Sequence, residues 1–160
     1  ITVGGASVGD HDHVRAARDE VAIGEVFSRI AIKPGKPNVF GLAGRVPVFS
    51  LPGNPVSALV SFHLYVRPAL RKMIGLAAEP VGATVGARLG APMKKKTGRT
   101  EWVRTSVERD GDQLTVDPLR PQGSHMLTGI ANADALIRFD DECESADAGS
   151  TVDIRWLDWS

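Results

Sequence analysis

The sequence predicts an α/β unit followed by a small all-β barrel. Strands alternate with helices over residues 1–75, whereas residues 83–156 hold short strands with turn residues between them and no long helix. The stretch 76–81 separates the two patterns. We therefore expect one domain over residues 1–78 and a second over residues 79–160, which a chain of 160 residues allows.

The first half is expected to alternate strands with two helices. Glycine and proline residues mark the turns between these elements. The expected strands are Ile1–Val3, Val26–Ile32, Asn38–Leu42 and Val46–Leu51, and the expected helices are His11–Val21, capped by Asp10 or Asp12, and Val56–Ile74.

The helix expected over Val56–Ile74 has the clearest limits. Asn54 suits the N-cap and Pro55 the first helical position, where a missing N–H costs nothing. Gly75 supplies a C-terminal stop, and Pro68 should kink the helix. The apolar residues recur at helical spacing and form one stripe: Val56, Leu59, Val60, Val66, Leu70, Met73 and Ile74.

The second half is expected to consist of short strands. These are Ala83–Leu89, Glu101–Glu108, Gln113–Val116, Ala135–Phe139 and Ser150–Trp156. Asp110-Gly111-Asp112 is a turn sequence between the second and the third of them. This spacing indicates a small barrel or sandwich.

Composition excludes several classes of function. Lys plus Arg (19) equals Asp plus Glu (19), so the chain has no net field that would attract nucleic acid or an anionic membrane. The single cysteine, Cys143, excludes an internal disulfide and fits a reducing cytoplasm. No apolar run approaches the roughly 18 residues that span a bilayer. We therefore expect a local site to hold any anion, and no nucleic-acid or membrane partner.

The segment Pro52–Ser57 joins a strand end to a helix N-terminus. Free N–H groups and the positive end of the helix dipole favour an anion there. Gly53 lets a ligand approach the backbone, and Ser57 adds a hydroxyl group. The alternative is a tight, well-capped turn without a ligand.

A second strand-to-helix loop, Gly4–Asp12, has similar features. Gly5 and Ser7 again combine close backbone approach with a hydroxyl group, and the carboxylates of Asp10 and Asp12 could hold Mg²⁺ near a phosphate. The alternative is one aspartate that caps the helix and one solvated charge.

Two basic turns are further candidates for anion binding. Lys33-Pro34-Gly35-Lys36-Pro37 presents two cations on a backbone that its prolines restrict. The segment 94–102 brings three lysines and Arg99 together before Trp102. Solvated side chains on polar turns are the alternative for both.

Five motifs follow one another along the chain: GGASVGDHD, IKPGKP, LPGNPVSALVSFHLYVRPALRKMIG, KKKTGRTEWVR and QGSHML. In this order they resemble the MoeA/gephyrin family of molybdopterin molybdenumtransferases. The resemblance covers all 160 residues but only the C-terminal portion of a family member. It implies the C-terminal half of a molybdopterin-binding, MoaB/MogA-like three-layer α/β domain, followed by the family's C-terminal β-barrel.

The resemblance also implies an activity: insertion of molybdate into adenylylated molybdopterin, with Mg²⁺ and release of AMP. Cleaving an anhydride between two anions requires clustered cations, backbone donors and a metal. The implied catalytic residues are Asp12, Lys33 and Lys36, with Asp12 as the metal ligand. The implied cofactor-binding residues are Gly5, Ser7, Asp10, Pro37, Gly53, Asn54, Ser57, Arg99 and Ser124.

The family resemblance further implies partners and a location. These are a cytoplasmic homodimer, small-molecule substrates, upstream domains of the same protein and the molybdopterin adenylyltransferase. Two alternatives stay open: a binding module that retains molybdopterin or adenylate contacts without turnover, and a gephyrin-like scaffold. Molybdate and tungstate are not distinguished, because both are tetrahedral and nearly equal in size.

The chain opens on Ile1-Thr2-Val3-Gly4-Gly5, the end of a strand that runs into a glycine turn. We expect from this a chain that begins within a domain. Its sheet should then have an uncovered edge or face, and the stripe of the helix at 56–74 should be incompletely buried.

Overall fold

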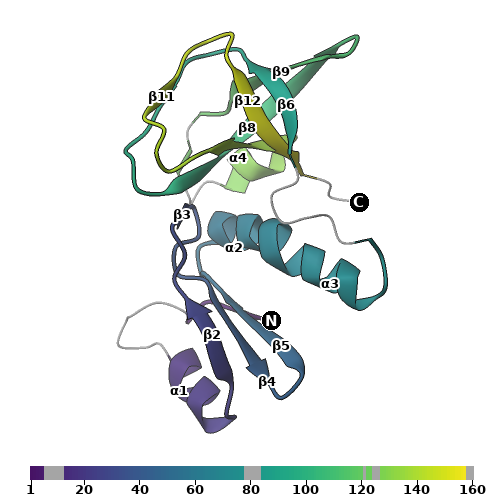
Figure 1. Ribbon diagram of the computed structural model, residues 1–160. Helices are drawn as coiled ribbons and strands as arrows, with labels where there is room; N and C mark the ends of the chain where they lie inside the picture. The colour runs from purple at the N-terminus through teal and green to yellow at the C-terminus, as the bar shows by residue number, and fades with distance from the viewer. Residues whose placement is uncertain (6–12, 78–83, 121, 124–126, 158–160) are drawn as a thin grey trace. The chain divides into compact units, whose positions relative to one another are not determined.

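The computed structural model describes residues 1–5, 13–77, 84–120, 122–123 and 127–157 (Figure 1). They form two compact units. The first unit comprises Ile1–Ile30 and Pro34–Ala78, and the second comprises Ala31–Lys33 and Glu79–Ser160.

The first unit has a four-stranded mixed sheet with a helical segment packed against it. The strand order is β1-β5-β4-β2; β1 runs parallel to β5, and the other neighbours are antiparallel. The elements are β1 (Thr2–Val3), α1 (His13–Glu20), β2 (Gly24–Ser28), β4 (Val39–Ala43) and β5 (Val46–Leu51). The strand-and-helix alternation that the sequence predicted for this half is thereby confirmed.

The helical segment after β5 consists of three parts. It begins as α2 (Pro55–Ser61), widens into one π-helical stretch (Phe62–Val66) and continues as α3 (Arg67–Met73). Pro68 accounts for the widening, because it has no N–H to donate and its ring crowds the carbonyl four residues earlier. The Arg67 N–H bonds the carbonyl of Phe62, five residues back. The disturbance expected at Pro68 therefore takes the form of a π-helical turn.

Gly75 ends this segment, as the sequence predicted. Its φ of +80° is in the left-handed region, where a residue without a Cβ is favoured. The Gly75 N–H bonds the carbonyl of Lys72 at 3.2 Å, and the Leu76 N–H bonds the carbonyl of Arg71 at 3.0 Å. These two bonds satisfy carbonyls that the helix leaves open, in a Schellman motif.

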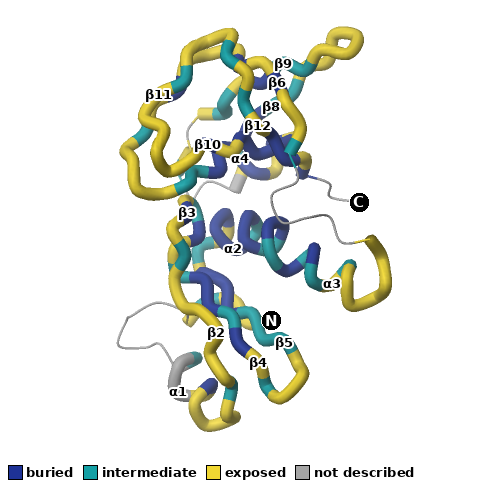
Figure 2. The backbone as a smooth tube through the Cα atoms, viewed as in Figure 1, coloured by how far each residue is buried: buried dark blue, intermediate teal, exposed yellow. Residues whose placement is uncertain are grey.

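The apolar stripe of the helical segment is buried only in its first part (Figure 2). Val56, Val60 and Val66 are fully buried, whereas Met73 is 62% exposed and Ile74 72% exposed. Every residue of β1 and β2, the two outer strands of the sheet, is also exposed. The expected incomplete burial is therefore found at the end of α3 and at both sheet edges.

The second unit contains a closed five-stranded barrel. Its strands follow the order β10-β12-β6-β9-β8, and a further pairing of β10 with β8 closes the ring. The pair β6–β9 is parallel, and the other four pairs are antiparallel. The strands are β6 (Val85–Leu89), β8 (Thr100–Asp110), β9 (Gln113–Pro118), β10 (Ala135–Phe139) and β12 (Thr151–Trp156). The small barrel predicted for the second half is confirmed.

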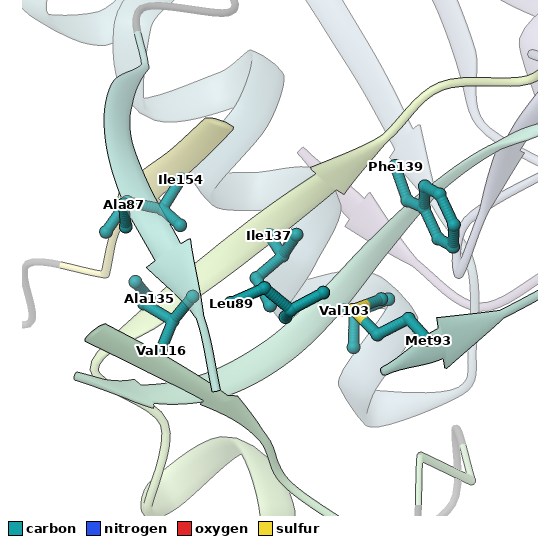
Figure 3. Close-up of a cluster of buried hydrophobic side chains, with 9 residues drawn as sticks. All are labelled: Ala87, Leu89, Met93, Val103, Val116, Ala135, Ile137, Phe139 and Ile154. Carbon is teal, nitrogen blue, oxygen red and sulfur yellow. The ribbon is translucent and has the colours of Figure 1, made fainter. Parts of the chain in front are cut away.

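Nine buried apolar side chains from the second unit form one cluster (Figure 3). They are Ala87, Leu89, Met93, Val103, Val116, Ala135, Ile137, Phe139 and Ile154. Alternate residues of β10 and of β6 enter this cluster, as the twofold period of a strand requires. Gly111, with φ +57°, makes the turn between β8 and β9, where Asp110 pairs with Gln113.

The expected strand Val26–Ile32 differs from the structure. Strand β2 ends at Ser28, because Arg29 takes the left-handed φ of +67°. The next two N–H groups, of Arg29 and Ile30, bond the carbonyls of Asn38 and Lys36. The residues that follow Ile30, Ala31–Lys33, no longer belong to the first unit. Strand β3 (Ile32–Lys33) pairs in parallel with β8 of the second unit.

Three other short elements were not predicted. They are β7 (Met93–Lys94), α4 (Leu127–Ala131) and β11 (Ser145–Ala146), which pairs with β7. The strands β7 and β11 have two residues each and therefore show no period in the sequence. Only their hydrogen bonds to one another define them.

Candidate functional site

The first residues of two glycine loops, Gly4-Gly5 and Pro52-Gly53, lie side by side in the first unit. Strands β1 and β5 are parallel, with Val3 opposite Leu51, so the loops that follow them leave the sheet at the same edge. The Gly4 N–H bonds the carbonyl of Leu51 at 3.1 Å, and a Cβ on Gly53 would lie 3.2 Å from the Cα of Gly4. The structure thus brings together two segments that the sequence singled out separately.

Backbone is accessible in both glycine loops. Gly5 and Gly53 are exposed, and Gly4 and Gly5 have left-handed φ values of +87° and +66°. A side chain at either of these last two positions would be strained. At Gly4, Gly5 and Gly53, therefore, no side chain stands between the backbone and an approaching ligand.

The start of α2 differs in one respect from the expectation. Asn54 has the extended conformation of an N-cap, and its carbonyl accepts a 2.9 Å bond from the Ala58 N–H, but its side chain makes no capping bond. Pro55 occupies the first helical turn, as predicted. Ser57 is only 6% exposed, so its hydroxyl is much less accessible than the backbone of Gly53.

A buried asparagine holds the turn that carries Lys36. The Asn38 amide donates to the carbonyl of Gly35 and, at 2.8 Å, to the hydroxyl of Ser61 on α2. Asn38 is 3% exposed and Ser61 is fully buried, whereas Lys36 is exposed and Pro37 is partly buried. The Lys36 ammonium therefore projects from a backbone that is anchored to the helix.

Lys33 lies in the second unit, at a pocket of about 440 Å³. The Lys33 Nζ is 3.0 Å from a carboxylate oxygen of Glu101. The pocket is lined by Lys33, Met93, Lys94, Glu101, Val103, Pro118, Arg120, Gln122 and Phe139. Its volume lies within the range of small-molecule sites.

A buried arginine supports one wall of this pocket. Arg104 on β8 is 2% exposed, and burial lowers the pKa of its guanidinium because desolvation disfavours the charged form. Its Nε donates to the Gln122 side-chain oxygen and its Nη2 to the carbonyl of Gly123, both at 3.2 Å. The Gln122 amide in turn donates to the Arg104 carbonyl at 2.8 Å. The Gln122 side chain also accepts from the Arg104 backbone N–H at 3.2 Å, so it bonds both backbone groups of Arg104.

The remaining binding residues proposed from the sequence differ in whether they line this pocket. Arg99 is exposed and does not line the pocket, whereas Lys94 of the same basic turn does. Lys95 lies 5.4 Å from the centre of the Phe139 ring, a cation–π contact. Ser7, Asp10, Asp12 and Ser124 lie outside the described residues.

Sequence reasoning missed four residues that shape these sites: Asn38, Glu101, Arg104 and Gln122. The sequence shows that these residues are polar, but not that they are held by partners that lie far along the chain. Within the described part of the chain, no three His, Cys, Asp or Glu side chains are grouped to hold a metal ion. None of the described helices is both long enough and apolar enough to cross a membrane.

Two family models match the chain. The first, described as "Probable molybdopterin binding domain", matches residues 1–72. The second, described as "MoeA C-terminal region (domain IV)", matches residues 86–157. The two matches correspond to the two halves that the sequence distinguished.

Relatives match nearly the whole chain. A molybdopterin molybdenumtransferase of Haemophilus influenzae is 37% identical over 96% of this chain and 38% of its own length. Molybdopterin molybdenumtransferase 1 of Mycobacterium tuberculosis is 36% identical over 97% of this chain and 37% of its own length. The chain therefore spans less than two fifths of the length of these relatives.

A solved structure likewise matches nearly the whole chain over only part of its own length. The crystal structure of a molybdopterin biosynthesis MoeA protein from Pyrococcus horikoshii superposes with a TM-score of 0.72 at 31% identity, over 98% of this chain and 37% of that one. Sequence motifs, two domain matches and the fold agree. The chain belongs to the molybdopterin molybdenumtransferase (MoeA) family, of which it carries the molybdopterin-binding α/β region and the C-terminal β-barrel.

Proposed function

We propose that this chain acts in molybdenum cofactor biosynthesis, as part of an enzyme that inserts molybdate into adenylylated molybdopterin and releases AMP. The adjacent glycine loops of the first unit carry the proposal. Both follow parallel strands, and their backbones approach so closely that a side chain on Gly53 would crowd Gly4. The exposed backbone of Gly5 and Gly53 lies at such an edge, where phosphate and other oxyanions commonly bind.

Cationic side chains in each unit add to this support. In the first unit, Lys36 projects from the turn that Asn38 anchors. In the second unit, Lys33, Lys94 and Arg120 line one pocket. Oxyanion transfer depends chiefly on positioned cations and backbone donors, which stabilise negative charge as it develops in the transition state.

Mg²⁺ is part of the proposal, with Asp12 as its ligand and Asp10 beside it. Magnesium, which prefers oxygen ligands, would neutralise phosphate charge during cleavage. These carboxylates lie outside the described residues, and the described part offers no group of three metal-ligating side chains.

The proposal extends to a cytoplasmic homodimer and to the molybdopterin adenylyltransferase as a partner. Exposed apolar side chains of the first unit, Ile1, Val3, Val26 and Val46, support contact with further protein surface. The family resemblance supports the location and the adenylyltransferase.

Replacing Lys36 by alanine is expected to weaken binding of molybdate or AMP by about 1–3 kcal/mol, the contribution of a charge-assisted hydrogen bond. Calorimetry on the wild-type chain and the variant measures the difference. Lys72→Ala is a matched control, because Lys72 is an exposed lysine at the end of α3. Equal affinities in all three proteins would exclude Lys36 from the site.

Replacing Asp12 by asparagine is expected to slow Mg²⁺-dependent, molybdate-dependent release of AMP from adenylylated molybdopterin, which is the direct assay of the proposed function. The fold should persist, because asparagine still caps a helix. If the melting temperature falls and the rate does not, Asp12 serves only as a cap.

A further inference from the structure

We propose that Glu101 sets the oxyanion affinity of the barrel pocket, by holding Lys33 in an ion pair that an incoming tetrahedral anion must replace. The inference rests on the proposed oxyanion chemistry of this chain and assigns a specificity role to a residue that the sequence did not single out. Glu101 would thereby limit how strongly the pocket binds doubly charged anions.

Backbone pairing brings the two side chains together. Strand β3 joins the second unit beside β8, with Lys33 directly opposite Glu101 and the Thr100 N–H bonded to the carbonyl of Ala31 at 3.0 Å. The Lys33 Nζ then lies 3.0 Å from the Glu101 carboxylate. The side chain of Glu101 is 18% exposed and that of Lys33 is 53% exposed. The carboxylate is therefore the more confined partner, and the ammonium has freedom to turn towards a ligand.

The charges around the pocket favour an anion. Lys33, Lys94 and Arg120 contribute three cations, and Glu101 is the one acid among the lining residues of the described barrel. The apolar side chains of Met93, Val103, Pro118 and Phe139 complete the lining. Charges interact more strongly beside such groups than in open water. Glu101 consequently has two unfavourable effects on an anion: it occupies Lys33, and it repels the ligand.

A purely positioning role for Glu101 predicts the opposite result. If the carboxylate served only to hold Lys33 ready, its removal would free a long side chain and weaken binding. Glutamine retains an oxygen that can accept from the Lys33 ammonium and removes only the negative charge. Repulsion from one carboxylate is twice as large for a dianion as for a monoanion at the same place. Neutralising Glu101 should therefore strengthen anion binding, and more so for the dianion.

Two tetrahedral probes test the inference on the 160-residue chain: molybdate alone, a dianion, and perrhenate alone, a monoanion of similar shape. Calorimetry at low ionic strength is expected to show that Glu101→Gln binds molybdate about tenfold tighter, or about 1.4 kcal/mol. Perrhenate should gain only about threefold, because its charge is half as large. Glu101→Asp, which keeps the charge, and Glu108→Gln, an exposed neutralisation on the same strand, should show no gain.

An unchanged or weaker affinity of Glu101→Gln for both probes would overturn the inference, as would equal gains in Glu101→Asp or Glu108→Gln. The absence of binding of either probe to any of these proteins would overturn it too. The assay for AMP release separates this result from the proposed function. A gain in oxyanion affinity of Glu101→Gln without any AMP release would support the inference and contradict the proposed function. AMP release without a gain in oxyanion affinity would support the proposed function and contradict the inference.

Discussion

Replacing Arg104 by alanine is expected to lower the free energy of unfolding of the barrel by about 3–5 kcal/mol, from a cavity and newly unpaired polar groups. Arg104 is 2% exposed, and its guanidinium bonds Gln122 and Gly123. All three tryptophans of the chain lie in the second unit. Urea unfolding followed by tryptophan fluorescence therefore reports on the barrel.

Arg109→Ala is the matched control for Arg104, since Arg109 is an exposed arginine on the same strand. A surface substitution of this kind should change stability by no more than about 0.5 kcal/mol. Arg104→Lys keeps the charge but not the forked donors, so it should fall between the alanine variant and the wild type. Equal losses in Arg104→Ala and Arg109→Ala would show that the Arg104–Gln122 bonds contribute nothing.

Replacing Asn38 by alanine is expected to destabilise the first unit by about 2–4 kcal/mol, because the Gly35 carbonyl and the Ser61 hydroxyl lose a buried donor. The change should also loosen the turn that carries Lys36. The Ile30 N–H, which bonds the carbonyl of Lys36, reports on that turn directly. Hydrogen exchange at Ile30 should be faster in the variant than in the wild type.

Asn132→Ala provides the comparison for Asn38, since Asn132 is an exposed asparagine of the second unit. Its replacement should leave both the stability of the first unit and the exchange at Ile30 unchanged. If Asn38→Ala exchanges at Ile30 as slowly as the wild type, the turn is held by its prolines and glycine and does not depend on the asparagine.

Local chemistry explains why much of the fold was predictable. The limits of the helical segment follow from Pro55 at the first turn and Gly75 in the left-handed region. The turn between β8 and β9 follows from Gly111, and strand β10 matches its expected range, Ala135–Phe139. In each case the signal and the structure it specifies lie within a few residues of one another.

The sites were predictable only in part, for a related reason. Glycine loops and lysine-bearing turns are visible in a sequence, because they depend on backbone freedom and on charge. The partners that hold them are distant: Asn38 reaches Ser61, and Arg104 reaches Gln122. Nothing local distinguishes these polar residues from solvated ones, because burial defines their role.

Patterns visible in the sequence alone specify the two-part architecture, the ends of the main helical segment and the family. Long-range pairing, in contrast, places Ile32–Lys33 beside β8 instead of in the first sheet, and hence Lys33 opposite Glu101. A strand of two residues has no period of its own, so long-range hydrogen bonding selects its partner. Because β3 pairs with β8, Lys33 belongs to the second unit, whereas Lys36 belongs to the first. Only two residues lie between these lysines in the sequence.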